Sequence, residues 1–232
     1  MTELTAKLIA RTKPEEAIFG DVPADIQELI AYCARVSNPD NQMNTETSDK
    51  LIQFLIRKKH WSPFAMANIV IEVTTTRDIG RQILRHQSMD FQEFSQRYAD
   101  PTKSLGFVTR EARLQDPKNR QNSISISPGD GENIAGLVSD WELTQQHVIE
   151  VATDAYEWAI KNGIAKEQAR AVLPEGLTVS RMYINGTVRS WIHFLESRLD
   201  ESTQKEHRDI ALLIAKIVAE LFPVIKTINK DI

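Results

Sequence analysis

The chain has 232 residues, 41% of them hydrophobic, which is enough for one large domain or two small ones with a sizeable core. A formal net charge of -4 argues against general nucleic-acid binding, because that function usually needs a basic surface. The single cysteine, Cys33, excludes an internal disulfide and a cysteine-rich zinc site, and no metal site is expected. No apolar run approaches the roughly 18 residues of a membrane span, and the first residues lack a signal-peptide hydrophobic region. We therefore expect a cytoplasmic protein.

The predicted elements alternate short strands with helices. Strands are expected where β-branched residues alternate with others, as in Ile69, Ile71 and Val73. Helices are expected where apolar residues recur every three or four positions. These patterns predict strands at 7–12, 67–76, 106–110 and 177–184, and helices at 23–36, 48–59, 76–87, 132–162, 165–172, 187–197 and 203–221.

The stretch 132–162 has the clearest helical periodicity. Its apolar stripe predicts a long helix packed on the core with buried tryptophans, and Gly163 stands at the C′ position. The stripe consists of Ile134, Leu137, Val138, Trp141, Val148, Val151, Ala152, Ala155 and Ala159. The polar stretch 116–131 is predicted to be a mobile loop within a single domain that spans 1–232.

Three arginines at 77, 81 and 85 are four positions apart, so on the helix predicted at 76–87 they share one face. Their mutual repulsion would be offset by an anionic ligand, although a solvated basic face is the plainer interpretation. They lead into 85–98, a stretch crowded with arginine, histidine, hydroxyl and acidic side chains. We therefore expect an anion site there.

Three other stretches compete as functional sites. On the helix predicted at 187–197, Arg189 and His193 share a face, either to bind a ligand or as ordinary residues of an amphipathic helix. Arg170 stands shortly before a proline, and the charged residues of 204–208 resemble a solvated first helical turn. No Gly-x-Gly-x-x-Gly, Walker or Gly-x-Ser-x-Gly motif is present. Anionic ligands would therefore be bound by arginine and hydroxyl side chains.

The 85–98 stretch resembles the motif of a known family. Arg85-His86 and Ser95 are similar to the signature of flavin-dependent thymidylate synthases, which reads Arg-His-Arg, seven residues, Ser. The similarity extends, in the order found in that family, to Glu93, Arg97, Tyr98 and the blocks 60–64, 169–174 and 185–208. It covers most of residues 25–220.

This resemblance implies an α+β fold, in which a mixed α/β single domain has a central curved, largely antiparallel sheet flanked by helices. It also implies a homotetramer with active sites shared between subunits. The implied reaction makes dTMP from dUMP, with methylenetetrahydrofolate as carbon donor, FAD as hydride source and NADPH as reductant. No activated cysteine is required for it, in agreement with a core-like position of Cys33.

The resemblance also implies roles for individual residues. The pyrimidine nucleotide would be bound by Gln82, Arg85, Glu93, Ser95, Arg97, Arg170 and Arg198, with Arg170 coming from another subunit. The flavin would be bound by Ser37, His60, Ser62, Arg85, His86, Gln87, Glu93, Thr187, Arg189 and His193. The catalytic candidates are Arg198, Ser95 and Glu93. Among them Arg198 would polarise the pyrimidine near N3 and its carbonyl.

Three positions depart from the family pattern and are candidates for altered specificity. Gln87 replaces the third signature arginine, Asp90 stands where a small hydroxyl residue is usual, and Ala65 replaces a common glutamate. An acidic side chain suits the cytosine amino group, so a dCMP or dUMP 5-hydroxymethylase that uses the same folate without net reduction is a second hypothesis. A catalytically weakened flavin- or nucleotide-binding relative is a third hypothesis, and a plain structural domain is a fourth.

Overall fold

The structure is a computed structural model that describes residues 4–20, 25–127 and 132–227. These residues divide into two compact units, each of which is described separately. The first is built mainly from Thr74–Ile83 and Glu93–Met182, and the second from Thr5–Val73, Leu84–Gln92 and Tyr183–Ile232. The expectation of one domain for the whole chain stays a prediction.

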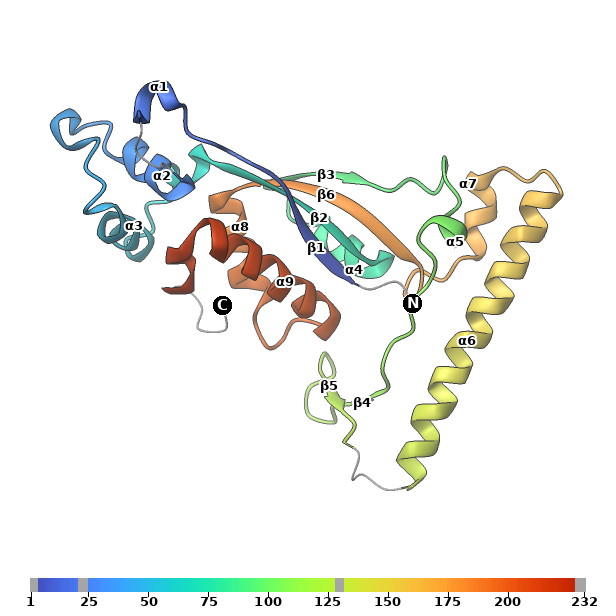
Figure 1. Ribbon diagram of the computed structural model, residues 1–232. Helices are drawn as coiled ribbons and strands as arrows, with labels where there is room; N and C mark the ends of the chain where they lie inside the picture. Colours follow the sequence, from blue (N-terminus) through green and yellow to red (C-terminus); the bar gives the residue numbers. More distant parts are fainter. Residues whose placement is uncertain (1–3, 21–24, 128–131, 228–232) are drawn as a thin grey trace. The chain divides into compact units, whose positions relative to one another are not determined.

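A four-stranded sheet has the order β1-β2-β6-β3, and Figure 1 shows these strands side by side. Their bounds are Thr5–Arg11, Asn68–Thr76, Val179–Thr187 and Met89–Glu93, respectively. Main-chain hydrogen bonds show the strand directions. Just after the end of β1, Thr12 N–H donates to the carbonyl of Asn68, the first residue of β2. At the two ends of the β2–β6 pair, Val188 N–H donates to Ala67 and Arg77 N–H donates to Thr178. Neighbouring strands therefore run antiparallel, as predicted.

The β2 strand confirms the period-two pattern of the sequence. Ile69, Ile71 and Val73 are fully buried, and the alternating Glu72 and Thr74 are buried as well. A strand that is covered on both faces is a central strand, which agrees with the position of β2 between β1 and β6.

The second unit, called the α9 unit below, contains most of the helices. They are α1 (Glu16–Phe19), α2 (Ile26–Ala34), α3 (Ser48–Arg57), α8 (Val188–Arg198) and α9 (Lys205–Leu221), with short 3-10 turns η1 (Pro39–Asn41), η2 (Ser62–Met66) and η4 (Pro223–Thr227). Asp25 begins α2 by accepting hydrogen bonds from the N–H groups of Gln27 and Glu28. Helix α9 packs on α8 and on β1, and Trp191 and Phe194 of α8 are fully buried.

The first unit, called the α6 unit below, contains the long helix α6. Its elements are α4 (Arg77–Ile83), α5 (Pro101–Ser104), β4 (Arg113–Gln115), β5 (Ser123–Ser125), α6 (Glu132–Lys161), α7 (Lys166–Ala169) and η3 (Arg170–Val172). Gly163 has a φ of 80° just after α6, which confirms the expected glycine C′ position. Gly80 lets α4 approach β6 closely, since an added Cβ would lie 2.8 Å from Met182 Cε.

Three predicted elements need correction. The helix expected at 76–87 ends at Ile83, because the following residues turn and then form β3. The strand expected at 106–110 is reduced to one isolated bridge between Phe107 and Thr178. The loop expected at 116–131 contains β5, which pairs antiparallel with β4, while 128–131 lie outside the described residues.

The apolar stripe of α6 is mostly not part of a core within this chain. Ala152 and Ala159 are buried, but Trp141 is 42% exposed and Val151 is 55% exposed. A second tryptophan of the helix, Trp158, is 63% exposed. The prediction of buried tryptophans is therefore wrong for the single chain. Among the described residues, no helix is both long and apolar enough to cross a membrane.

Candidate active site

Helix α8 carries the centre of the candidate site in the α9 unit. Thr187 caps its first turn by accepting a hydrogen bond of 3.1 Å from Ser190 N–H. Gly186 leaves room for the helix, since an added Cβ would lie 3.2 Å from the Trp191 indole nitrogen and 3.3 Å from Met89 Cγ. Trp191 in turn donates from Nε1 to the Ile69 carbonyl at 3.1 Å. The helix is thereby fixed against the strands with Arg198 in its last turn.

Arg198 is held by a histidine of the signature stretch. Its Nε–H donates to His86 Nε2 at 2.8 Å. A guanidinium can only donate, so Nε2 must be unprotonated and the neutral imidazole carries its proton on Nδ1. Burial lowers the pKa of His86 to about 4, and the nearby Arg198 charge contributes to this lowering. Near neutral pH the ring is therefore an acceptor for Arg198 and a donor at Nδ1.

A second histidine, His207, is fully buried beside this pair. The Phe194 ring centre lies 4.8 Å from that of His86 and 5.9 Å from that of His207. The pKa of His207 is lowered to about 4, first by burial and then by the charges of Arg198 and His86. His207 was not among the predicted site residues, because its neighbours in the sequence are charged. Its spacing from Ile210 and Ile214 places it on the apolar face of α9 and was the signal that could have identified it.

Arg85 adds a second positive charge near Arg198. The pKa of Arg198 is lowered first by burial and then by repulsion from Arg85. Arg85 itself is exposed and lies beyond the end of α4, so it does not share a helical face with Arg77 and Arg81 as predicted. Two guanidinium groups that repel each other leave a local positive potential that favours an anionic ligand.

The outer side of α8 presents Arg189 and His193, in agreement with their predicted common face. His193 Nδ1 lies 3.1 Å from Glu196 Oε2, and its ring centre lies 4.7 Å from that of Trp61. His60 and Ser62, at the neighbouring η2 turn, are exposed. Ser37 is exposed as well, but it lies in the loop after α2.

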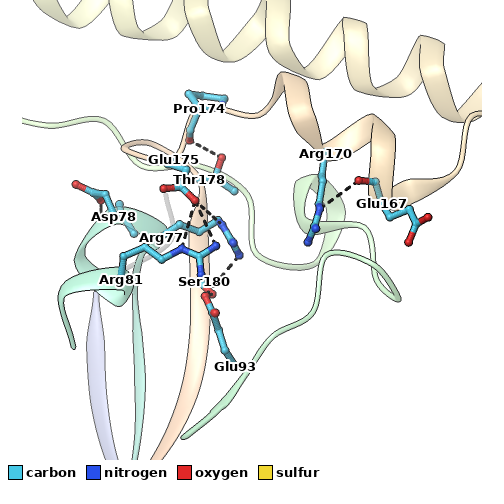
Figure 2. Close-up of polar contacts among 11 residues, drawn as sticks. Arg77, Asp78, Arg81, Glu93, Glu167, Arg170, Pro174, Glu175, Thr178 and Ser180 are labelled. Atoms are coloured by element: carbon cyan, nitrogen blue, oxygen red, sulfur yellow. Dashed lines mark hydrogen bonds and ion pairs between the residues drawn. The ribbon is translucent and has the colours of Figure 1, made fainter. Parts of the chain in front are cut away.

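The α6 unit holds the other two arginines of the predicted basic face in an ion-pair network (Figure 2). Arg77 lies 3.5 Å from Glu93 Oε1 and 3.6 Å from Glu175 Oε1. Arg81 shares the same Glu175 oxygen at 3.4 Å, and Ser180 donates to Glu93 at 2.9 Å. Carboxylates of the chain thus compensate these arginines, which corrects the expectation of a basic face open to an anion. No local pattern indicated Glu175, because its partners lie far away along the chain.

The remaining predicted nucleotide residues lie in the same unit. Arg97 Nε is 3.2 Å from Glu167 Oε2. Arg170 Nε donates to the Glu167 carbonyl at 3.3 Å, as Figure 2 shows. The Ser95 hydroxyl accepts from Arg97 N–H at 3.3 Å. Gln82 is half-buried on α4. The structure therefore brings Arg97 and Arg170 to one acidic residue, Glu167, which was not among the predicted site residues.

The three departures from the family pattern have different environments. Gln87 is exposed in the turn before β3, and Ala65 is half-buried in η2. Along β3, Met89 is buried while Asp90 is exposed, so alternation directs Asp90 and Glu93 to opposite faces of the strand. No group of three or more histidine, cysteine or acidic residues among those described could hold a metal ion.

The antiparallel sheet and the helices beside it, among them α8 with its half-buried Arg198 held by a neutral His86, define a mixed α/β protein. A family model described as thymidylate synthase complementing protein matches residues 21–224. The flavin-dependent thymidylate synthase of a Synechocystis strain is 47% identical over 96% of this chain and 97% of its own length. A probable flavin-dependent thymidylate synthase of Paramecium bursaria Chlorella virus 1 is 43% identical over 95% of this chain and 96% of its own length. The chain belongs to this family.

Solved structures support the same fold. The UMP/dUMP methylase PolB from Streptomyces cacaoi, crystallised with 5-Br dUMP, aligns with a TM-score of 0.76 and 23% sequence identity. The alignment covers 100% of this chain and 98% of that one. The mixed α/β fold with an antiparallel sheet, implied by the sequence motifs, is thereby confirmed.

Proposed function

We propose that the protein is an FAD-dependent methyltransferase that converts dUMP to dTMP. The observation that carries this proposal is the half-buried Arg198, which is held by a neutral His86 and repelled by Arg85. A guanidinium fixed beside a pyrimidine carbonyl stabilises the negative charge that develops when the ring is activated at C5. The hydrogen bond to His86 uses only Nε, so the terminal nitrogens can face the ring.

The nucleotide phosphate needs a separate cation. Arg97 and Arg170 are the candidates, because guanidinium groups bind phosphate in a bidentate manner. Arg97 contacts the carboxylate of Glu167, and Arg170 contacts its main-chain carbonyl. We infer that a bound phosphate replaces Glu167 as the partner of Arg97, an exchange that costs little because both groups are about half exposed. Gln82, Glu93 and Ser95 complete the proposed nucleotide set.

The residues of the α9 unit fit an anionic flavin. Arg85 and Arg189 are exposed, and neither forms an ion pair with a described carboxylate. The Nδ1–H of His86 adds a fixed donor for a ring carbonyl or nitrogen. The proposed flavin-binding residues of this unit are Ser37, His60, Ser62, Arg85, His86, Gln87, Thr187, Arg189 and His193, and Glu93 of the α6 unit is proposed as well. When bound, the flavin supplies the hydride that completes the methyl group. Methylenetetrahydrofolate and NADPH are the proposed co-substrates.

The exposed side of α6 supports a proposal of self-association, with a homotetramer as the expected form. The residues at heptad spacing on this helix are Ile134, Leu137, Trp141, Thr144, Val148, Val151, Ala155 and Trp158. All of them except Thr144 are apolar. Five of the apolar side chains are at least 42% exposed, namely Leu137, Trp141, Val148, Val151 and Trp158. Such a stripe matches the seam by which two helices pack against each other. A second copy of the chain is the partner that would cover it.

The test is direct measurement of product mass. Purified protein is expected to be yellow with flavin absorbance, and to convert dUMP to dTMP when given methylenetetrahydrofolate and NADPH. A product with a hydroxymethyl group, formed without NADPH consumption, would replace this proposal with the hydroxymethylase hypothesis. Colourless protein that takes up no FAD would overturn the proposed cofactor.

A further inference from the structure

Two side chains outside the proposed nucleotide set hold Glu93, which is a member of that set. Ser180 of β6 donates from its hydroxyl to Glu93 Oε1 at 2.9 Å. The Nη1 nitrogen of Arg77 lies 3.5 Å from the same oxygen. Figure 2 shows Ser180 and Arg77 beside this carboxylate. Both contacts are made to Oε1, so neither residue uses the second carboxylate oxygen, Oε2.

These three side chains are largely withdrawn from solvent. Ser180 is 1% exposed, and the side chains of Arg77 and Glu93 are 8% and 18% exposed. Water and salt screen an ion pair of this kind less than a pair on the surface. Glu93 keeps some exposed surface, so a ligand can reach its carboxylate while Oε1 stays fixed.

The main chain fixes Arg77 at the junction of β2 and α4. Its N–H donates to the Thr178 carbonyl at 3.0 Å, and the N–H of the next residue, Asp78, donates to the Glu175 carbonyl at 3.4 Å. The Asp78 carboxylate in turn lies 2.6 Å from Nη2 of Arg110. The beginning of α4 is therefore joined to the segment that leads into β6, the strand that carries Ser180.

The Arg77 guanidinium is oriented by a second carboxylate. Its Nε lies 3.6 Å from Glu175 Oε1, and Arg81 Nε lies 3.4 Å from that oxygen. The four groups form a row of alternating charge from the half-exposed Arg81 through Glu175 and Arg77 to Glu93. The outer pair contributes little energy because it is half exposed. It does hold the guanidinium between the two carboxylates.

We propose that Ser180 and Arg77 are positioning residues, which fix the Glu93 carboxylate so that Oε2 accepts a hydrogen bond from the nucleotide. The inference rests on the proposed function, because it takes Glu93 as a nucleotide-binding residue. A carboxylate only accepts hydrogen bonds, so the group it meets is a donor, either a sugar hydroxyl or a ring N–H. Two contacts to Oε1 restrict the carboxylate before the ligand arrives, which lowers the entropy lost on binding.

The main test compares Ser180→Ala with Thr178→Val by calorimetric titration of the purified full-length protein with dUMP. Both substitutions remove one buried hydroxyl, but that of Thr178 donates to the Pro174 carbonyl at 2.7 Å and not to Glu93. Ser180→Ala is expected to raise the Kd for dUMP about tenfold, as for the loss of one hydrogen bond to a charged group. Thr178→Val is expected to leave the Kd unchanged, and Ser180→Thr, which keeps a hydroxyl, to recover most of the affinity. An unchanged Kd in Ser180→Ala, or an equal loss in both variants, overturns the proposal.

A double-mutant cycle separates positioning of Glu93 from a general structural effect. In the Glu93→Ala background, Ser180→Ala is expected to leave the Kd unchanged, because the carboxylate that it orients is absent. Arg77→Met, measured at a temperature where the variant is folded, is expected to show the same coupling. Additive losses overturn the proposal.

The readout also separates this inference from the proposed reaction. If dUMP binds and the cycle shows coupling but no dTMP forms, only the proposed reaction fails. If dTMP forms and Ser180→Ala has no effect on the Kd, only the positioning role fails. An original protein that binds no dUMP overturns both.

Discussion

The Nε–H group of Arg198 donates to Nε2 of His86 at 2.8 Å, and this bond links the last turn of α8 to the Arg-His motif of the sequence. It sets the tautomer of the imidazole and the direction of the guanidinium at the same time. Partial burial of both groups lowers their pKa values, so the pair consists of a neutral ring and one fixed cation. His86 therefore positions Arg198, in addition to any contact with a cofactor.

Replacing the acceptor of this bond is expected to slow turnover. His86→Phe removes Nε2, and hydrogen bonds to charged groups contribute about 1.5–3 kcal/mol, so kcat should fall roughly tenfold to a hundredfold. His86→Gln places an amide oxygen near the original Nε2 and should recover most of the loss. The measurement is release of the C5 hydrogen of dUMP at saturating FAD, with flavin content checked for each variant. Equal kcat values for the Phe and Gln variants would show that the bond to Arg198 has no positioning role.

The histidines at positions 86 and 207 predict an acid-sensitive fold. The folded-state pKa of each is about 4, below the ordinary value of 6.5, so the unfolded chain binds more protons between these limits. The stability contributed by the neutral rings is therefore complete above about pH 6.5 and is lost as the pH falls towards 4. The free energy of unfolding, measured from pH 7.5 to 4.5, should decrease with acidification. His207→Leu should make this decrease shallower, and a variant with an unchanged slope would contradict the assignment.

Local pattern was sufficient to predict the strands and helices that frame the site. The alternation in Ile69, Ile71 and Val73 predicted β2, and the spacing of Arg189 and His193 predicted their common face on α8. The motif around Arg85 and His86 predicted the family, which the comparisons confirm. These features depend on residues that are close together in the sequence.

Interactions between distant segments could not be predicted in the same way. Helix α4 ends at Ile83 because the chain then forms β3, which pairs with β6. Helical propensity alone does not predict that pairing. Glu175 contacts Arg81, which is 94 positions away, and Glu167 contacts Arg97, which is 70 positions away. No local spacing in the sequence therefore indicated the two glutamates. The periodicity of α6 identified an apolar face, but not whether this chain or another one covers it.

The ion-pair network of the α6 unit predicts unequal effects of two arginines. The Arg77 side chain is 8% exposed and pairs with Glu93 and Glu175, whereas the Arg81 side chain is 50% exposed. Arg77→Met leaves a partly buried carboxylate without its partner and should destabilise the protein by about 3 kcal/mol. Arg81→Met should cost less than about 1 kcal/mol, as for other exposed pairs. Urea unfolding of both variants tests this difference, and equal midpoints would contradict it.

The heptad stripe of α6 predicts how the protein assembles. Val151 belongs to that stripe and is 55% exposed, so in an assembled protein Val151→Glu would place a charge in an apolar seam. By light scattering, the original chain is expected to be a tetramer, and the variant should dissociate at the same concentrations. Gln146→Glu is the matched control, since it introduces the same charge on an exposed position of α6 outside the stripe. An original chain that is monomeric, or a Val151→Glu variant that keeps the full mass, would rule out α6 as the contact between copies.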